Sequence, residues 1–336
     1  MAARPPLSIL DLSLIVEGGS AADALRNSLD LAQHAERLGY QRYWVAEHHN
    51  MDGVASSATS VLIGYLAAGT KTIRVGSGGV MLPNHAPLVI AEQFGTLATL
   101  YPGRIDLGLG RAPGTDQMTM RALRRTLATQ SEDDFIGDVI ELAEYFKPPP
   151  DQRHPVRAIP GIGCDVPIWL LGSSLYSAQV AAHLGYPFAF ASHFAPAMLM
   201  QALQIYRARF RPNGQPGALT QPHAMVAVNV VCADTDDEAA YLFTSLQQRF
   251  LGMQTGKRGP LPHPIPVAEM NALGSPAERA GMEQMLTVTA VGAPATVRGR
   301  LSDIVAQTQA DELIITGAVH DHAARKRSYE LLAGIG

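Results

Sequence analysis

The sequence predicts a closed (β/α)₈ barrel, and three observations lead to this fold class. Apolar runs of strand length alternate with helix-like segments along the chain, which is the pattern of βα units in a parallel sheet. About eight such runs can be counted, the number that closes this barrel. The 336 residues exceed the roughly 250 that are typical of the fold and leave room for insertions. We therefore expect one barrel domain over residues 1–336, rather than an open doubly wound sheet.

The first half of the chain shows the alternation most regularly. A strand is expected at residues 7–16, and a helix follows that opens at Gly18-Gly19-Ser20 and runs to Leu38. Gly39 ends this helix as a C-terminal cap would. The strands expected next are 43–46, 73–83 with an interruption at Gly78-Gly79, and 105–109; the helices between them are 56–68 and 87–100.

The second half contains two expected insertions. Residues 116–146 have helical character, whereas residues 147–164 are rich in proline and are expected to form an ordered excursion without a helix. Residues 252–280, rich in Gly, Pro and Met, are expected to form an irregular mobile lid between strands seven and eight. The remaining strands are expected at 167–171, 188–191, 224–232 and 312–316.

Composition narrows the class of protein. The chain is 47% hydrophobic and 17% charged, which supports a large buried core and argues against disorder. A net charge of −4 argues against a nucleic-acid partner. No apolar stretch approaches the roughly 20 residues that span a bilayer, and no signal-peptide pattern opens the chain. Cys164 and Cys232 lie far apart and form no metal-ligand pair. We expect a cytoplasmic protein with no membrane partner.

A carboxylate and two imidazoles, Glu47-His48-His49, follow the second expected strand directly. In a parallel barrel the C-terminal ends of the strands carry the chemistry, so these residues are candidates for proton transfer. A solvated loop is the plain alternative. Zinc binding is not expected, because neither an H-x-H nor an H-E-x-x-H spacing occurs here. His85 and His193 follow other strands, either as surface histidines or as parts of a polar ring around His48; their roles and that of His49 stay open.

Glycines interrupt the third expected strand at Gly76, Gly78 and Gly79. Glycine within a strand marks either a bulge or a place where another group approaches the backbone closely. Both interpretations stay open here: a bare bulge, or a planar cofactor that lies against this backbone.

A phosphate site is expected after strands four and five. Ser173 and Ser174 stand at the start of a helix, where free N–H groups and the helix dipole favour an anion. Ser177 adds a hydroxyl, and Arg111 can bind phosphate through its planar guanidinium. An ordinary helix N-cap is the alternative for the serines. Neither a GxGxxG after the first strand nor a GxxxxGK[ST] occurs, so Rossmann and P-loop sites are not expected.

Six motifs together resemble one family. They are AERLGY (35–40), VAEHH (45–49), VGSGGVMLP (75–83), AEQ (91–93), YPGRIDLGLGR (101–111) and VGAP (291–294). Each motif alone is weak, but their order and spacing are specific, and they span nearly the whole chain. The chain resembles the bacterial luciferase-like flavin-dependent monooxygenases.

The resemblance implies a barrel that binds FMN at its C-terminal face. It also implies a non-proline cis peptide in the third strand beneath the flavin ring. The residues that match the family's functional positions are His48 for catalysis, Gly78 and Gly79 for the cis peptide, and Arg111, Ser173, Ser174 and Ser177 for the phosphate. Two departures argue against light emission: Gly110 replaces the cysteine of the light-emitting luciferases, and Ser173 replaces their acidic residue.

The expected function is that of an FMN-dependent monooxygenase, which uses reduced flavin and O₂ to oxygenate a small apolar organic substrate. Without a Rossmann module, a separate flavin reductase is expected to supply reduced FMN. The resemblance also implies a homodimer that forms through helices near strands two and three. Three alternatives remain: F420-dependent hydride transfer on the same barrel, a non-catalytic flavin-binding protein, and a metal-dependent barrel hydrolase.

Overall fold

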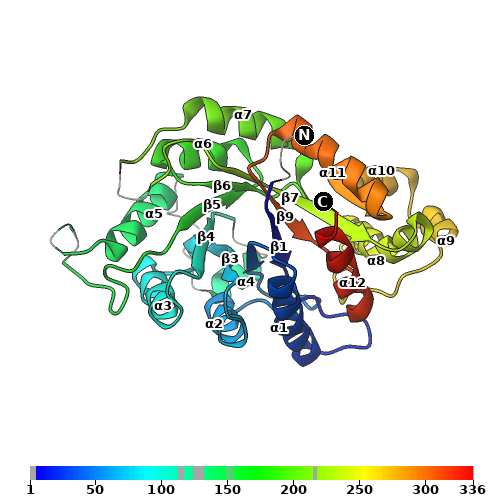
Figure 1. Ribbon diagram of the computed structural model, residues 1–336, viewed down its shortest axis with the longest axis horizontal. Helices are drawn as coiled ribbons and strands as arrows, with labels where there is room; N and C mark the ends of the chain where they lie inside the picture. The colour runs from blue at the N-terminus through cyan, green and yellow to red at the C-terminus, as the bar shows by residue number, and fades with distance from the viewer. Residues whose placement is uncertain are drawn as a thin grey trace.

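The computed structural model describes residues 5–112, 117–123, 132–149, 151, 153, 155–214 and 218–335. Within them, eight parallel strands close into a barrel, because β9 pairs with both β1 and β7 and completes the ring (Figure 1). The predicted fold class is therefore confirmed. Around the ring the strands are β1 (Leu7–Asp11), β2 (Arg42–Val45), β3 (Arg74–Met81), β4 (Ile105–Gly110), β5 (Ile168–Gly172), β6 (Phe188–Phe190), β7 (Ala224–Cys232) and β9 (Glu312–Thr316).

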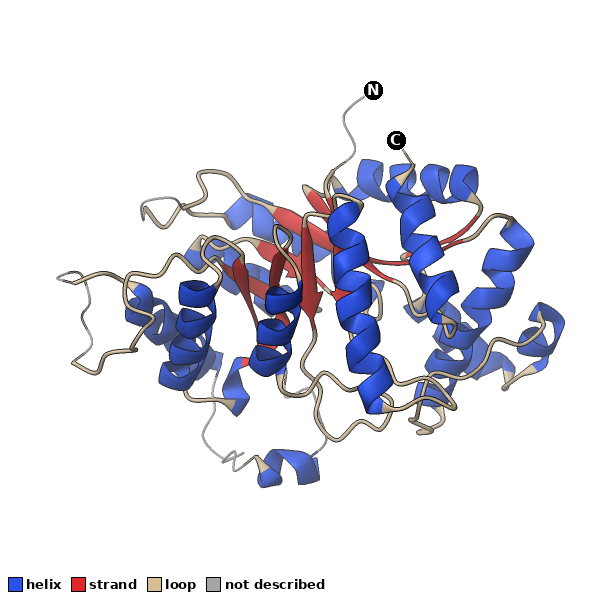
Figure 2. Ribbon diagram, turned by 60° about the horizontal axis from the view of Figure 1, so that its bottom comes forward, coloured by secondary structure: helices blue, strands red, loops and turns tan. Residues whose placement is uncertain are grey.

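Helices surround the strands, as Figure 2 shows. The helices that follow the barrel strands are α1 (Ala21–Arg37), α2 (Thr59–Gly69), α3 (Pro87–Leu100), α5 (Glu132–Phe146), α6 (Leu175–Leu184), α7 (Leu199–Arg209), α8 (Asp236–Gln254) and α12 (His322–Ala333). The additional elements are α4 (Gln117–Ala122), α9 (Val267–Ala272), α10 (Pro276–Met285), α11 (Pro294–Thr308), η1 (Leu82–Asn84) and η2 (Pro196–Met198). No described helix is long and apolar enough to cross a membrane.

The core has two layers because side chains alternate along each strand. In β2, Tyr43 and Val45 pack outward in the large cluster between strands and helices. Trp44 points inward, where it meets Trp169 with ring centroids 5.2 Å apart. Seven further residues that pack with Trp44 in the inner cluster are Leu10, Ala46, Trp169, Ala189, Met225, Ala227 and Ile314.

A buried ionic network lies at the opposite end of the barrel from the predicted site. Arg42 begins β2, and its Nη1 lies 2.8 Å from the Asp106 carboxylate of β4. Its Nε lies 2.8 Å from the carboxylate of Glu312, which begins β9. The guanidinium also lies 4.8 Å from the Trp169 ring centroid. The Arg42 guanidinium thus joins β2, β4 and β9, and it covers the inner cluster at the N-terminal end of the barrel.

The first strand is shorter than predicted, because the chain turns after Asp11. The Asp11 carboxylate accepts a hydrogen bond of 2.9 Å from the backbone N–H of Ser13. Ser13 itself has a positive φ of 48°, which a strand does not accommodate. The apolar residues Leu14 and Val16 therefore lie in a connection and not in the barrel wall.

A ninth strand, β8 (Thr289–Gly292), was not predicted. It pairs only with the last part of β7, from Asn229 to Cys232, while the first part of β7 pairs with β6 and β9. Four residues without an apolar run give too weak a signal for prediction. β8 therefore extends the sheet beside the ring without changing the barrel.

The expected irregular segment at residues 252–280 is more regular than predicted. It includes the end of α8, all of α9 and the start of α10, which gather on one side of the molecule (Figure 1). Leu261, Met270 and Met282 are buried in a separate hydrophobic cluster there. Residues 147–164 contain no helix or strand in their described part, as predicted. The expected helical stretch 116–146 contains α4 and α5, and its residues 116 and 124–131 lie outside the described ones.

Candidate active site at the C-terminal end of the barrel

Glu47 anchors the chain where it leaves β2. Its buried carboxylate accepts hydrogen bonds of 2.8 Å from Nε2 of His49 and 2.8 Å from Nε2 of His85. The backbone N–H of Met81, at the end of β3, donates another at 3.2 Å. Burial alone would raise the pKa of Glu47, but the hydrogen bond and charge of His85, then His49, hold it below the usual value. Glu47 is therefore an ionised group that ties β2 to β3 and η1.

The same three side chains have the composition of a metal site, because one ligand atom from each of Glu47, His49 and His85 lies within 4.8 Å of the others. However, both Nε2 atoms lie 2.8 Å from the same carboxylate oxygen. Ligand atoms on a tetrahedral zinc ion stand about 3.3 Å apart, given bonds of about 2.0 Å. The spacing is that of direct hydrogen bonds, so we interpret these residues as a positioning network.

His48 follows Glu47 and has a buried, unpaired ring nitrogen. Its backbone N–H donates to the Ser56 carbonyl oxygen at 3.1 Å, which fixes the connection after β2. Its Nδ1 atom is shielded from solvent and has no hydrogen-bond partner among the described residues. Burial, followed by the positive charge of Arg249, lowers the pKa of His48 to about 4. His48 is therefore a neutral imidazole at pH 7, with a nitrogen free for a ligand.

His193, which follows β6, resembles His48 in its unpaired ring nitrogen and its lowered pKa. Its Nδ1 is also buried without a partner in the described part of the chain. Burial and the nearby His48 lower its pKa to about 3, so the two imidazoles lie close to each other. A third such atom is Nη1 of Arg249, on α8. Most buried polar atoms have a hydrogen-bond partner, so three without one around His48 indicate a place for a polar ligand.

Sequence analysis did not identify Arg249. It lies within α8 between the buried residues Leu246 and Phe250, and no motif surrounds it. The sequence shows only that this arginine lies within one helical turn of apolar residues. Its place in the site depends on contacts with the loop after β2, which is distant in the sequence. His85 was correctly noted at a strand end, although its partner Glu47 could not be predicted.

The bulge and the cis peptide predicted for β3 both lie at Gly78 and Gly79. The Gly78–Gly79 peptide bond is cis, as the family resemblance implies. The pairing of β3 with β4 shifts register between Gly78 and Val80, so the bulge is present. β2 ends at Val45, opposite Ser77. The chain therefore leaves β2 towards His48 at the level of these two glycines.

Replacing Gly79 with alanine is expected to destabilise the protein. A Cβ atom there would lie 2.7 Å from the backbone oxygen of Gly108 in β4, and a strand backbone within the barrel cannot move aside. Overpacking of this kind costs about 1–3 kcal/mol. Urea unfolding of Gly79→Ala measures the loss, with Gly137→Ala as the control because its Cβ would meet nothing within 4 Å. Equal stability of the two variants would contradict the close approach.

The structure brings Arg111, after β4, to the start of α6. The guanidinium carbon lies 4.2 Å from the ring centroid of Tyr176, the second residue of this helix. Ser174 occupies the N-cap position, but its side chain makes no capping hydrogen bond. Ser174 is therefore an N-cap residue, as the alternative held, but it lacks the usual side-chain hydrogen bond of such a cap. The first N–H groups of α6 and the Arg111 guanidinium together have the donors that a phosphate needs.

Ser173 and Ser177 contribute differently. Ser173 is half-buried at the end of the β5–α6 connection. Ser177 is buried, and its hydroxyl donates to the Ser174 carbonyl oxygen at 2.8 Å. In this arrangement Ser177 can accept a hydrogen bond but does not offer its proton to a phosphate. It packs under the loop instead, because a Cβ at Gly172 would lie 2.1 Å from its Oγ.

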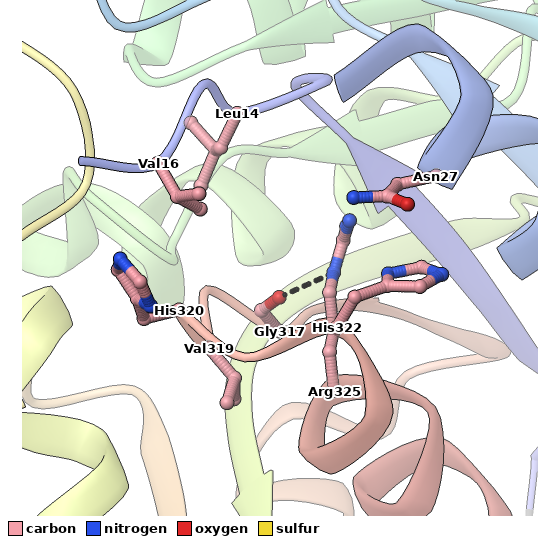
Figure 3. Close-up of a pocket in the computed structure, with 8 residues that line it drawn as sticks. All are labelled: Leu14, Val16, Asn27, Gly317, Val319, His320, His322 and Arg325. Carbon is pink, nitrogen blue, oxygen red and sulfur yellow. Dashed lines mark hydrogen bonds between the residues drawn. The ribbon is translucent and has the colours of Figure 1, made fainter. Parts of the chain in front are cut away.

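A separate pocket, shown in Figure 3, lies between the chain after β1 and the β9–α12 connection. Two of its charged or titratable side chains already have partners. Arg325 donates to the Gly317 carbonyl oxygen at 3.0 Å and to Asp11 at 2.8 Å, and Nε2 of His322 lies 2.8 Å from Asp30. None of the residues predicted for catalysis or phosphate binding lines this pocket.

Comparisons with known proteins agree with this architecture. A protein of Escherichia coli (strain K12) named "Luciferase-like monooxygenase" is 57% identical over 327 residues, which cover 96% of this chain and 95% of that protein. The "N-acetyl-S-alkylcysteine monooxygenase" of Bacillus subtilis (strain 168) is 40% identical over 254 residues, 75% of each chain.

Solved structures show the same barrel. Apo-MsnO8 matches with a TM-score of 0.89 at 38% identity and covers 98% of both chains. More distant matches show the fold alone. The oxygenating constituent of 3,6-diketocamphane monooxygenase of Pseudomonas putida, in complex with FMN, has a TM-score of 0.74 at 19% identity, over 98% of this chain and 97% of that one. An F420-dependent secondary alcohol dehydrogenase has a TM-score of 0.68 at 13% identity, over 99% of each chain.

The family model that matches the chain covers nearly the whole barrel. It spans residues 7–312, from the first residue of β1 to the first residue of β9, and describes luciferase-like monooxygenases. The fold, the relatives and this model all lead to one assignment: the chain belongs to the luciferase-like monooxygenase family.

Proposed function

We propose that this protein is an FMN-dependent monooxygenase, which uses reduced FMN and O₂ to oxygenate a small apolar organic substrate. The observation that carries the proposal is the neutral His48 imidazole with its buried, unpaired Nδ1. It stands at the C-terminal end of the barrel, where such enzymes bind their reactants. Membership of a monooxygenase family supports the same reaction class.

The residues present fit FMN. Arg111 and the uncapped first turn of α6 would hold its phosphate. The backbone of Gly78 and Gly79 would lie beneath its ring. Reduced flavin, when bound, supplies the electrons that activate O₂. The protein's own contribution is to orient the reactants, to exclude water and to offer the His48 Nδ1 as a proton acceptor or hydrogen-bond partner.

Two proteins similar to this chain support the choice of substrate and cofactor. The Bacillus relative is named for an N-acetyl-S-alkylcysteine, a small molecule with an apolar alkyl thioether. The diketocamphane enzyme was solved with FMN. The F420-dependent dehydrogenase shares the barrel, so hydride transfer from F420 is the second candidate function.

Cofactor and turnover can be tested together. We expect the protein to bind FMN in preference to F420 in parallel titrations. With an added flavin reductase and NADH it should consume O₂ in a substrate-dependent way, whereas without the reductase it should not oxidise NADH. Tighter binding of F420 would favour hydride transfer. FMN binding without substrate-dependent O₂ consumption, over a broad panel of substrates, would favour a non-catalytic flavin protein.

Replacing Arg111 with methionine is expected to weaken FMN binding about 10- to 100-fold, because a charged hydrogen bond to phosphate is worth about 1.5–3 kcal/mol. Riboflavin lacks the phosphate, so its affinity should not change. Fluorescence titration of both flavins measures the difference, with Arg157→Met, an exposed arginine, as the control. A parallel loss for riboflavin and FMN would show that Arg111 does not bind the phosphate.

We also propose a homodimer that forms through α2 and α3. Large apolar side chains are exposed on both helices: Val61 is 72% exposed, Tyr65 44% and Leu100 63%. Exposed apolar side chains on neighbouring helices are typical of an interface. Sedimentation analysis should give twice the chain mass, and Val61→Glu should shift the population to monomer. A wild-type monomer at micromolar concentration would contradict this proposal.

A further inference from the structure

Arg249 is a half-buried cation, and its Nη1 atom is shielded from solvent without a partner among the described residues. Its Nη2 has only a weak contact, 3.8 Å from the sulfur of Met51. The buried arginines Arg42 and Arg325 differ from it, because Arg42 pairs with two carboxylates and Arg325 with Asp11. Arginine remains charged in proteins even when burial lowers its pKa. Shielding one end of a guanidinium from water without a hydrogen-bond acceptor is costly, which suggests that an anion from outside completes the site.

Two loops hold the guanidinium in place beside His48. A Cβ at Gly53 would lie 3.1 Å from Nη1 of Arg249 and 2.0 Å from the backbone oxygen of Gly259. The loop after β2, which carries His48 and Met51, therefore meets the loop after α8 at this arginine. The charge of Arg249 also reaches His48, whose pKa it lowers after the larger effect of burial. Arg249 thus belongs to the surroundings of the proposed catalytic histidine.

We propose that Arg249 binds a carboxylate of the substrate, so that the substrate is a small organic acid whose apolar part lies beside His48. This inference rests on the proposed function and names its substrate class. The flavin phosphate is a less suitable occupant, because its candidate site lies after β4 and β5, at Arg111 and α6. The planar guanidinium fork fits the two oxygens of a carboxylate, and its single positive charge balances one carboxylate charge but only part of the charge of a phosphate dianion.

The binding test uses the flavin-free protein, so that its failure is distinct from a failure of the flavin proposal. Hexanoate, hexanamide and inorganic phosphate are titrated while the ¹³C-labelled imidazole of His48 is followed by NMR. Hexanoate should shift this resonance and hexanamide should bind at least about 30-fold more weakly. Arg249→Gln should remove this preference, and Arg249→Lys should restore part of it.

Stability gives an independent readout. Because no carboxylate in the described part of the chain pairs with Arg249, Arg249→Met should leave the melting temperature unchanged or raise it by about 2–4 °C. Arg325→Met, which leaves Asp11 unpaired, should lower it. The proposal is overturned if hexanamide binds as well as hexanoate, if Arg249→Gln binds hexanoate like the wild type, if only phosphate binds, or if Arg249→Met is as destabilising as Arg325→Met.

Discussion

Replacing His48 with alanine is expected to lower kcat about 10²- to 10⁴-fold, the usual contribution of a positioned acid or base, and to leave FMN affinity unchanged. The unpaired Nδ1 of His48 makes no structural hydrogen bond that the alanine variant would lose. The part of the oxygen consumption that depends on substrate measures turnover, and fluorescence titration measures FMN binding. Unchanged turnover would remove His48 from the mechanism.

His48→Gln separates two roles of this side chain. Glutamine can form a hydrogen bond to substrate but cannot accept a proton at neutral pH. Turnover as low as in His48→Ala would support proton transfer, whereas recovery would assign His48 a hydrogen-bonding role only.

The pH profile is expected to reflect the low pKa of His48. Burial, with the charge of Arg249, places this pKa at about 4, so the imidazole is neutral at every pH above that value. The acid limb of kcat/KM should therefore fall near pH 4, and not near the ordinary histidine value of about 6.5. Between these values the unfolded chain binds the proton better, so His48 makes stability decline as pH falls through this window. His48→Ala should weaken that decline.

Replacing Arg42 with methionine is expected to cost about 3–5 kcal/mol in the free energy of unfolding, the usual result of removing one partner of a buried ion pair. The variant leaves the buried carboxylates of Asp106 and Glu312 without this cation. It also removes the group that lies over Trp169. Since single domains are stable by only about 5–15 kcal/mol, this loss is a large share of the total.

The pH dependence of this variant follows from Glu312. Burial would raise its pKa, but the hydrogen bond of His223 and the charge of Arg42 hold it below the usual value in the wild type. The stability that this ionised carboxylate contributes is present above its unfolded pKa of about 4.5 and is lost as pH falls. The difference between wild type and Arg42→Met should therefore be largest near pH 7 and shrink in acid. Arg26→Met, in an exposed pair with Asp23, should cost less than about 1 kcal/mol.

The sequence predicted those features that depend on local patterns. Apolar runs identified all eight barrel strands, and the order of motifs identified the family. His48, Arg111 and α6 could be placed because each directly follows a strand, and the barrel gathers strand ends at one face. The length of the first strand was overestimated because apolar residues continue beyond Asp11, where a side-chain hydrogen bond turns the chain.

Features that depend on distant contacts could not be predicted. Nothing near Glu47 indicates that His85 would bind it from η1. Nothing near Arg249 shows that it lies beside Met51 and Gly53, about 200 residues earlier in the chain. The helices within residues 252–280 also depend on distant contacts, because their apolar residues pack mainly against α8. Glycine and proline there suggested irregularity, but these packing contacts decided the structure.

The inner cluster of the barrel also constrains the order of events in catalysis. Trp44, Trp169 and their neighbours fill the interior, and Arg42 covers it at the N-terminal end. Reduced flavin, O₂, substrate and product would then all pass through the same opening. The molecule that binds nearest to the inner cluster would therefore have to enter before the others and leave after them.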